Sequence, residues 1–328
     1  MNILLIANCR LGDSLVLIPT LKLLHRQYVG AHICLVSEQV GKGLVGAEEI
    51  LGGRGLVDEF ERLDMSGGFL VRTWKRLALF LRLRRVHWDF GGVLIPPVPP
   101  LTPSLVRRLS LYLRLSGVKR IVSPTSIAWS DDKVGLLLAR LFIPDIAESE
   151  LDYALPELTS PPRVQLPGGG RLLAVAPGAN MPLNIWLLER FEAVLSGLAD
   201  VVHPVYFGGE NERGLCEKLA KLVPGTLFVG RPMAEVEAAM RQCCCYLGND
   251  TGLMHLAAAC GLRCVVVFSW RNKSHCWEPC GTGHTAFRTE VLPCAGCLAH
   301  ECPLGTRECM AHHDVNAVKA AVEEKIHS

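Results

Sequence analysis

ILLIANCRLGDSLVLIPTLKLLHRQYVGAHICLV, residues 3–36, has the pattern of one β-α-β unit. Its two short apolar runs, Ile3–Ala7 and Ala31–Val36, are each typical of a buried strand. Between them, Leu15–Tyr28 places its apolar residues at helical spacing. Because parallel strands need a long crossover connection, which is usually a helix, this order predicts a parallel sheet covered by helices.

The same alternation recurs along the chain in two series. Phe90–Ile95 continues the first series, and the proline- and glycine-rich stretch Glu157–Gly170 then has the composition of a linker. We therefore predict two doubly wound α/β domains, residues 1–160 and 161–328, with a ligand-binding cleft between the carboxyl ends of their sheets. The strands predicted for the second series are Leu172–Ala176, Val201–Phe207, Thr226–Val229, Cys243–Leu247 and Cys264–Phe268.

Composition restricts the class of protein. Of the 328 residues, 49% are hydrophobic and 20% are charged, which supports a full core and excludes a disordered chain. The formal net charge of +2 gives no argument for nucleic acid as a partner of the whole protein. No apolar run approaches the roughly 18 residues of a membrane span, and the N-terminus lacks the pattern of a signal peptide. We expect a cytoplasmic protein.

Positive charge gathers in one region of the first domain. Between Ser66 and Ser130 there are eleven basic residues and one acidic residue, Asp89. One interpretation is a set of solvated helix faces. The other is a surface that meets an anionic partner, such as a phosphorylated glycolipid at the inner membrane, which fits the interleaved leucines. Nucleic acid ranks lower, because no stacking aromatic motif accompanies the charge. The basic residues are Arg72, Lys75, Arg76, Arg82, Arg84, Arg85, Arg107, Arg108, Arg114, Lys119 and Arg120.

The first predicted strand is followed by the loop RLGDS, residues 10–14, which opens a helix. Asp13 in this loop has two interpretations. It is a residue type favoured as a helix N-cap. It is also a carboxylate at the carboxyl end of a strand, where it could take a proton from an incoming hydroxyl.

Three loops of the second half carry groups suited to a nucleotide. The glycine of APGAN (176–180) lets the backbone approach phosphate oxygens, and a carboxylate of YFGGENE (206–212) could bind ribose hydroxyls. GNDTGLMH (248–255) ends a strand and begins a helix, whose N-terminal amides favour a diphosphate. His255 alone would be a core residue, but it follows Thr251 by one helical turn on the same face. The combination indicates a ligand site.

Taken in order, these segments resemble the ADP-heptose–lipopolysaccharide heptosyltransferase family, glycosyltransferase family nine, which has the GT-B fold of two Rossmann-like domains. No Gly-x-Gly-x-x-Gly follows any strand, so an NAD-dependent enzyme is disfavoured. The matching segments span almost the whole chain. They are RLGDS (10–14), PGAN (177–180), GGENE (208–212), GNDTGLMH (248–255), WEP (277–279) and the cysteines between 294 and 309.

The resemblance implies an inverting transfer of heptose from ADP-heptose to a lipopolysaccharide core or related glycan. It assigns Asp13 as the base that deprotonates the acceptor hydroxyl and places Arg10 and Gly12 on the acceptor side. It implies that no cofactor or metal is needed for catalysis. The donor site would be formed by Gly178, Ala179, Asn180, Asn184, Glu212, Asp250, Thr251, Gly252 and His255, with Asp250 on the sugar and Glu212 on the ribose.

One position departs from the family pattern. The family commonly has a lysine two residues before a tryptophan, where it neutralises the diphosphate, and here Asn184 precedes Trp186. Arg271 and Lys273 are candidates for a substitute cation. The alternatives are transfer of another nucleotide sugar in polysaccharide assembly, and a non-catalytic binding protein with a degenerate donor site.

Four of the fourteen cysteines lie close together in a loop, residues 294–309. Cys294, Cys297, Cys302 and Cys309 have spacings that resemble those of a metal site, and four thiolates could hold zinc or iron. The other interpretation is a reduced or partly disulfide-linked loop. A metal here would be structural, because the resemblance gives these cysteines no catalytic role.

Overall fold

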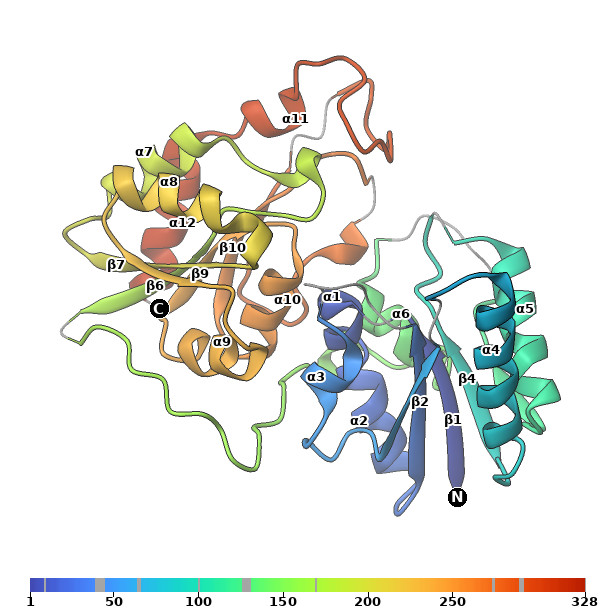
Figure 1. The fold of residues 1–328 in the computed structure, drawn as a ribbon. Helices are drawn as coiled ribbons and strands as arrows, with labels where there is room; N and C mark the ends of the chain where they lie inside the picture. The colour runs from blue at the N-terminus through green and yellow to red at the C-terminus, as the bar shows by residue number, and fades with distance from the viewer. Residues whose placement is uncertain are drawn as a thin grey trace. The chain divides into compact units, whose positions relative to one another are not determined.

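The computed structural model describes residues 1–8, 10–38, 45–63, 66–99, 101–125, 131–168, 170–272, 275–288 and 292–327. The chain divides into two compact units, Met1–Thr159 and Ser160–Ser328. Each unit is a parallel β-sheet with helices packed on its two faces (Figure 1). The predicted α/β fold class is therefore confirmed.

The sheet of the first unit has the strand order β3-β2-β1-β4-β5. Its strands are β1 Asn2–Ala7, β2 His32–Glu38, β3 Glu59–Leu63, β4 Phe90–Leu94 and β5 Arg120–Val122. Its helices are α1 Leu11–Leu15, α2 Ile18–Gln27, α3 Ala47–Leu51, α4 Phe69–Leu83, α5 Pro103–Leu115 and α6 Val134–Arg140, with a 3-10 turn η1 at Glu148–Glu150.

One predicted helix is two helices in the structure. The expected helix Leu15–Tyr28 begins earlier, at Leu11, and is interrupted before Ile18. Pro19 lies in the first turn of α2, where its missing N–H and fixed φ are tolerated. The loop predicted at residues 10–14 is therefore mostly the first helical turn after β1.

Both faces of the first sheet are covered. Leu4 of β1 packs on one face with Leu79 of α4 and Leu113 of α5. Leu23 of α2 packs with Leu136 of α6 in a separate cluster. Figure 1 shows α4 and α5 on one side of this sheet and α2 and α6 on the other.

The sheet of the second unit has the order β11-β10-β9-β6-β7-β8. Its strands are β6 Arg171–Ala176, β7 Val202–Gly208, β8 Thr226–Val229, β9 Cys245–Asn249, β10 Arg263–Val267 and β11 Thr285–Phe287. Its helices are α7 Leu188–Ser196, α8 Arg213–Leu222, α9 Met233–Met240, α10 Gly252–Ala259, α11 Glu308–Ala311 and α12 Val315–His327, and its 3-10 turns are η2 Pro182–Asn184, η3 Glu210–Glu212 and η4 His275–Trp277.

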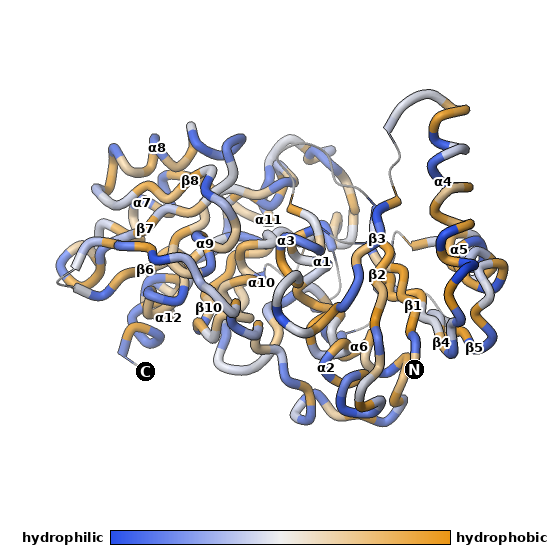
Figure 2. Tube along the Cα trace, turned by 60° about the horizontal axis from the view of Figure 1, so that its bottom comes forward, coloured by the Kyte–Doolittle hydropathy of each residue, from blue (hydrophilic) through white to orange (hydrophobic). Residues whose placement is uncertain are grey.

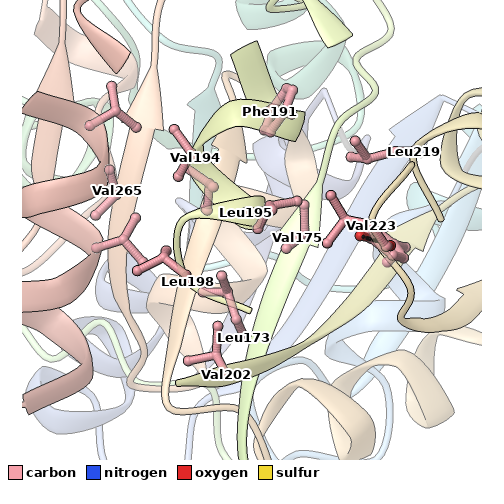
Figure 3. Packing of buried hydrophobic residues seen from close by; sticks show 14 of the residues in the cluster. Leu173, Val175, Phe191, Val194, Leu195, Leu198, Val202, Leu219, Val223 and Val265 are labelled. Carbon is pink, nitrogen blue, oxygen red and sulfur yellow. Dashed lines mark hydrogen bonds between the residues drawn. The ribbon is translucent and has the colours of Figure 1, made fainter. Parts of the chain in front are cut away.

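The second unit has a large apolar core beneath α7, α8 and α12. Leu173 and Val175 of β6 pack there with Phe191 and Leu195 of α7 and Leu219 of α8 (Figure 3). This packing fixes the sheet on which the polar loops stand. Within the described residues, every helix is too short or too polar to span a bilayer.

Candidate functional site

The polar loops of the second unit gather at the carboxyl ends of its strands. All neighbouring strands are parallel, so the segments that follow them leave the sheet at the same edge. The strand order reverses between β6 and β9, which are paired neighbours. Such a switch point is where open α/β sheets bind ligands. The loops after β6 and β9, residues 177–180 and 250–251, lie at this point.

Asn249, the last residue of β9, ties these loops together. Its side chain is fully buried. Its Nδ2 donates to the carbonyl of Pro177 over 2.8 Å, and its Oδ1 accepts a hydrogen bond of 3.0 Å from the backbone N–H of Trp186. Trp186 is itself buried edge-on against Phe191. Buried hydrogen bonds and aromatic packing thus fix the positions of the loops after β6 and β9.

Asn184 is engaged at both ends of its amide. It is 4% exposed. Its Nδ2 donates to Oδ2 of Asp250 over 3.0 Å, and its Oδ1 accepts a hydrogen bond of 2.6 Å from the hydroxyl of Ser269. Asn184 therefore positions Asp250 between the loops after β6 and β10.

Asp250 is a carboxylate with altered acidity. Burial raises its pKa to about 6, while the positive charges of Arg288 and Arg271 and the hydrogen bond from Asn184 lower it. Two arginines therefore act electrostatically on Asp250, the residue that the family resemblance places on the donor sugar.

Arg271 and Lys273 are the two candidates for a cation that replaces the family lysine. Arg271 donates from Nε to the carbonyl of Ala299 and from Nη2 to that of Leu298, each over 3.0 Å, so it supports the cysteine-containing loop. Lys273 lies outside the described residues. Arg288, directly after β11, is a third cation that sequence reasoning missed. No sequence signal marks it, because the strand that precedes it, Thr285–Phe287, is too short to show a periodicity.

Glu212 and Gly178 lie against one another. The carboxylate of Glu212 accepts a hydrogen bond of 2.8 Å from the backbone N–H of Gly209, and burial raises its pKa. A Cβ on Gly178 would overlap this carboxylate. A side chain at 178 would therefore displace this carboxylate, and the predicted phosphate loop and ribose carboxylate are adjacent.

The remaining predicted donor residues follow β6 and β9. Ala179 is buried and Asn180 is exposed. Thr251 is the N-cap residue of α10, which starts at Gly252, and within the described residues its side chain makes no capping hydrogen bond. His255 is buried one turn into α10, edge-on to Trp277, and burial lowers its pKa to about 4, so it is neutral at pH 7.

Asp13 lies in the first unit as the third residue of α1. Arg10 is the N-cap residue of this helix, so Asp13 is not the cap itself. Its carboxylate accepts a hydrogen bond from the backbone of Arg10, and burial raises its pKa to about 6 against this bond and the charge of Arg10. The hydroxyl of Ser14 donates to the carbonyl of Arg10 over 2.9 Å, which closes the turn containing Gly12. A carboxylate with this pKa is ionised at pH 7 and more basic than an ordinary aspartate.

The cysteines of the 294–309 loop are free thiols in the structure. In the described part of the chain, no three His, Cys, Asp or Glu side chains are placed to hold a metal ion. Cys297 is exposed and Cys294, Cys302 and Cys309 are half-buried, all as free thiols. Cys294, Cys297 and Cys302 all act electrostatically on Cys309, so the four thiols share one region, and the zinc or iron site stays a prediction.

Comparison with known structures defines the class of the fold. The glycosyl transferase family 9 structure from Veillonella parvula has a TM-score of 0.77 at 14% identity, covering 99% of this chain and 97% of that chain. The E. coli ADP-heptose lipopolysaccharide heptosyltransferase II has a TM-score of 0.72 at 16% identity, covering 99% and 98%. The protein thus has the GT-B fold of these glycosyltransferases.

A family model matches just under half of the sequence. Residues 146–307 match the model of glycosyltransferase family 9 (heptosyltransferase). The chain carries a domain of this family, and the resemblance seen in its motifs is confirmed. A search of curated proteins finds no match. The iron-containing dodecameric glycosyltransferase TibC of E. coli has a TM-score of 0.57 at 12% identity, covering 100% of this chain and 78% of that chain.

Proposed function

We propose that the protein is an inverting glycosyltransferase that moves heptose from ADP-heptose to a lipopolysaccharide core or a related glycan. The observation that carries the proposal is the arrangement at the carboxyl ends of β6, β7 and β9. There Gly178 contacts the Glu212 carboxylate, and Asn184 holds Asp250 beside the first turn of α10. A diphosphate would bind at that helix start, with ribose at Glu212 and sugar at Asp250.

Asp13 is the proposed catalytic base. Its carboxylate takes the proton of the acceptor hydroxyl while that oxygen attacks the anomeric carbon. The bond from the anomeric carbon to the phosphate oxygen breaks, and ADP leaves with the electron pair. Attack opposite the leaving group inverts the anomeric configuration. No metal is needed in this proposal, since amides at the start of α10 and nearby side chains stabilise the leaving diphosphate.

The acceptor proposed is an anionic glycolipid, bound with the protein at the inner face of the membrane. Helix α4 supports this part of the proposal. Leu70, Trp74, Leu77 and Leu81 form an exposed stripe at helical spacing, opposite the buried Leu79 and Leu83. Figure 2 shows hydrophobic and hydrophilic residues alternating along α4. Helices α4 and α5 also carry several basic residues, and their positive charge would favour an anionic membrane surface.

The proposal is tested first by nucleotide binding and then by transfer. The melting temperature of the full chain is measured with ADP, GDP, UDP and dTDP, and ADP is expected to raise it most. Transfer from ADP-heptose to a heptose-free lipopolysaccharide core follows, with the anomeric configuration of the product read by NMR. A larger shift with another nucleotide would indicate another donor sugar. No shift with any nucleotide and no transfer would indicate a non-catalytic binding protein.

A further inference from the structure

Arg288 occupies the carboxyl edge of the second sheet beside the proposed donor site. β11 pairs in parallel with β10 through Val267 and Phe287, so Arg288 lies level with Phe268. The guanidinium carbon of Arg288 is 4.1 Å from the centre of the Phe268 ring and 5.5 Å from that of Trp270. The guanidinium therefore stacks on aromatic rings through its planar face, and its N–H groups point outward in the plane, where they can form hydrogen bonds.

Among the described residues, only part of this guanidinium has a hydrogen-bond partner. Nε donates to Oε1 of Glu278 over 2.8 Å, and the same oxygen lies 2.6 Å from Nδ1 of His275. The Arg288 side chain is 4% exposed. Its Nη1 is buried, and no hydrogen-bond acceptor for it lies among the residues that the structure describes.

A buried charged donor without an acceptor is costly and calls for an explanation. The position of Arg288 supplies one. Its positive charge acts on Asp250, which directly precedes the N-cap residue of α10, an eight-residue helix. A guanidinium near Asp250 and the positive end of α10 both favour an anion at this edge.

The neighbouring polar side chains leave this role open. Asn184 carries no charge, and its amide is held by Asp250 and Ser269. Two nitrogen atoms of Arg271 are bound to the carbonyls of Leu298 and Ala299. Asn184 therefore offers no positive charge to a phosphate, and these two nitrogen atoms of Arg271 are already used. Within the described part of the chain, Nη1 of Arg288 has both the charge and an unused N–H.

We propose that Nη1 of Arg288 binds a phosphate oxygen of the donor diphosphate and stabilises the charge that develops there as the sugar leaves. The inference rests on the proposed function and deepens it, because it identifies the residue that recognises the diphosphate. Glu278 and the Phe268 ring are the positioning groups that hold the guanidinium in place. The sugar and the nucleoside are bound elsewhere in this scheme, so Arg288 discriminates by phosphate content.

The test compares affinities for ADP, AMP and adenosine, measured by calorimetry on the full chain and on Arg288→Met. Loss of a charged hydrogen bond to the diphosphate is expected to weaken ADP binding about ten- to a hundredfold. Adenosine binding should stay unchanged. Arg288→Lys keeps the charge without the forked donor set, so its ADP affinity should be intermediate. Arg190→Met is the matched control, because Arg190 is an arginine of α7 bound to the carbonyl of His313.

The outcomes separate this inference from the proposed function. If the wild type binds ADP and Arg288→Met binds all three ligands as the wild type does, the inference is wrong. If Arg288→Met binds ADP and adenosine more weakly by the same factor, Arg288 has a purely structural role, and the inference is also wrong. Failure of the wild type to bind ADP would instead contradict the proposed function. If Arg288→Met does not fold, the test uses the ratio of ADP affinity to adenosine affinity in Arg288→Lys. A lower ratio than in the wild type would support the inference, and an unchanged ratio would show a purely structural role and overturn it.

Discussion

The side-chain amide of Asn184 donates a hydrogen bond of 3.0 Å to the carboxylate of Asp250, across the loops that follow β6 and β9. The same amide accepts from Ser269, which follows β10. One neutral residue therefore connects three loops at the edge of the sheet and fixes the orientation of a carboxylate. A charged residue at 184 would change both the packing and the charge of this edge.

Asp250 should make stability depend on pH. Burial holds its pKa near 6 in the native state against an ordinary value of 3.8, so the native state binds more protons between these values. The contribution of Asp250 to the free energy of unfolding is therefore lost as pH rises from about 4 to about 6. Asp250→Asn removes this titration, and its stability relative to the wild type should increase over that window. Denaturant unfolding at several pH values measures the difference, and a pH-independent difference would contradict the assignment.

Asn184→Ala should destabilise the protein and alter the same titration. Removal of the amide leaves the buried Ser269 hydroxyl without its acceptor, which costs about 1–3 kcal/mol. Loss of the hydrogen bond that lowers the Asp250 pKa should also move its titration to higher pH. Unfolding free energies across pH measure both effects. If Asn184→Ala unfolds with the wild-type free energy and the Asp250 titration is not shifted, the hydrogen bonds of Asn184 contribute neither to stability nor to the pKa of Asp250.

Asp13 should govern the pH dependence of transfer. A base with a pKa of about 6 must be ionised to act, so kcat/KM should rise with pH through about 6 and then level off. Asp13→Asn should lower kcat by roughly a hundred- to ten-thousandfold and leave ADP affinity unchanged. Asp152→Asn is the control, since Asp152 forms a salt bridge with Lys22 in the same unit. A transfer rate preserved in Asp13→Asn would remove the base from the mechanism.

The sequence predicted the inner strands because they are short apolar runs, as in β1, β6 and β10. Of the edge strands, β8 was predicted, whereas β3, β5 and β11 were missed. β3 has the sequence EFERL with alternating charges, and β11 has three residues, which is too short for a periodicity. Arg288 was missed with β11. The gathering of Asn184, Asp250 and Ser269 depends on strand order, which sequence spacing alone does not specify.

Gly178→Ala should weaken nucleotide binding. The added methyl group would overlap the Glu212 carboxylate and displace it from the backbone N–H of Gly209. ADP affinity should fall about tenfold, as expected when a charged hydrogen-bonding group leaves its position. Gly214→Ala is the control, because a Cβ there meets open space in α8, and alanine should stabilise that helix by about 0.5–1 kcal/mol. Equal ADP affinities in the two variants would contradict the predicted ribose site.

Helix α4 should bind anionic membranes through its exposed stripe. Phe69, Leu70 and Trp74 are 76%, 75% and 70% exposed, so their substitution should leave folding intact. The excess of basic residues in α4 and α5 favours an anionic bilayer over a second, equally basic copy as the partner. Leu70→Ser with Trp74→Ser should lower co-sedimentation with phosphatidylglycerol vesicles by about tenfold or more, given roughly 1.5–3 kcal/mol per buried large apolar side chain.

The control for α4 is Val29→Ser, which removes an apolar side chain that is 92% exposed in a turn of the same unit. It should bind vesicles as the wild type does. Raising the salt concentration should weaken wild-type binding, because the basic residues contribute through screened charge. A wild type that stays in the supernatant with these vesicles would contradict membrane docking. Loss of a dimer in the double variant, with no vesicle binding by the wild type, would instead show that the stripe is covered by a second copy.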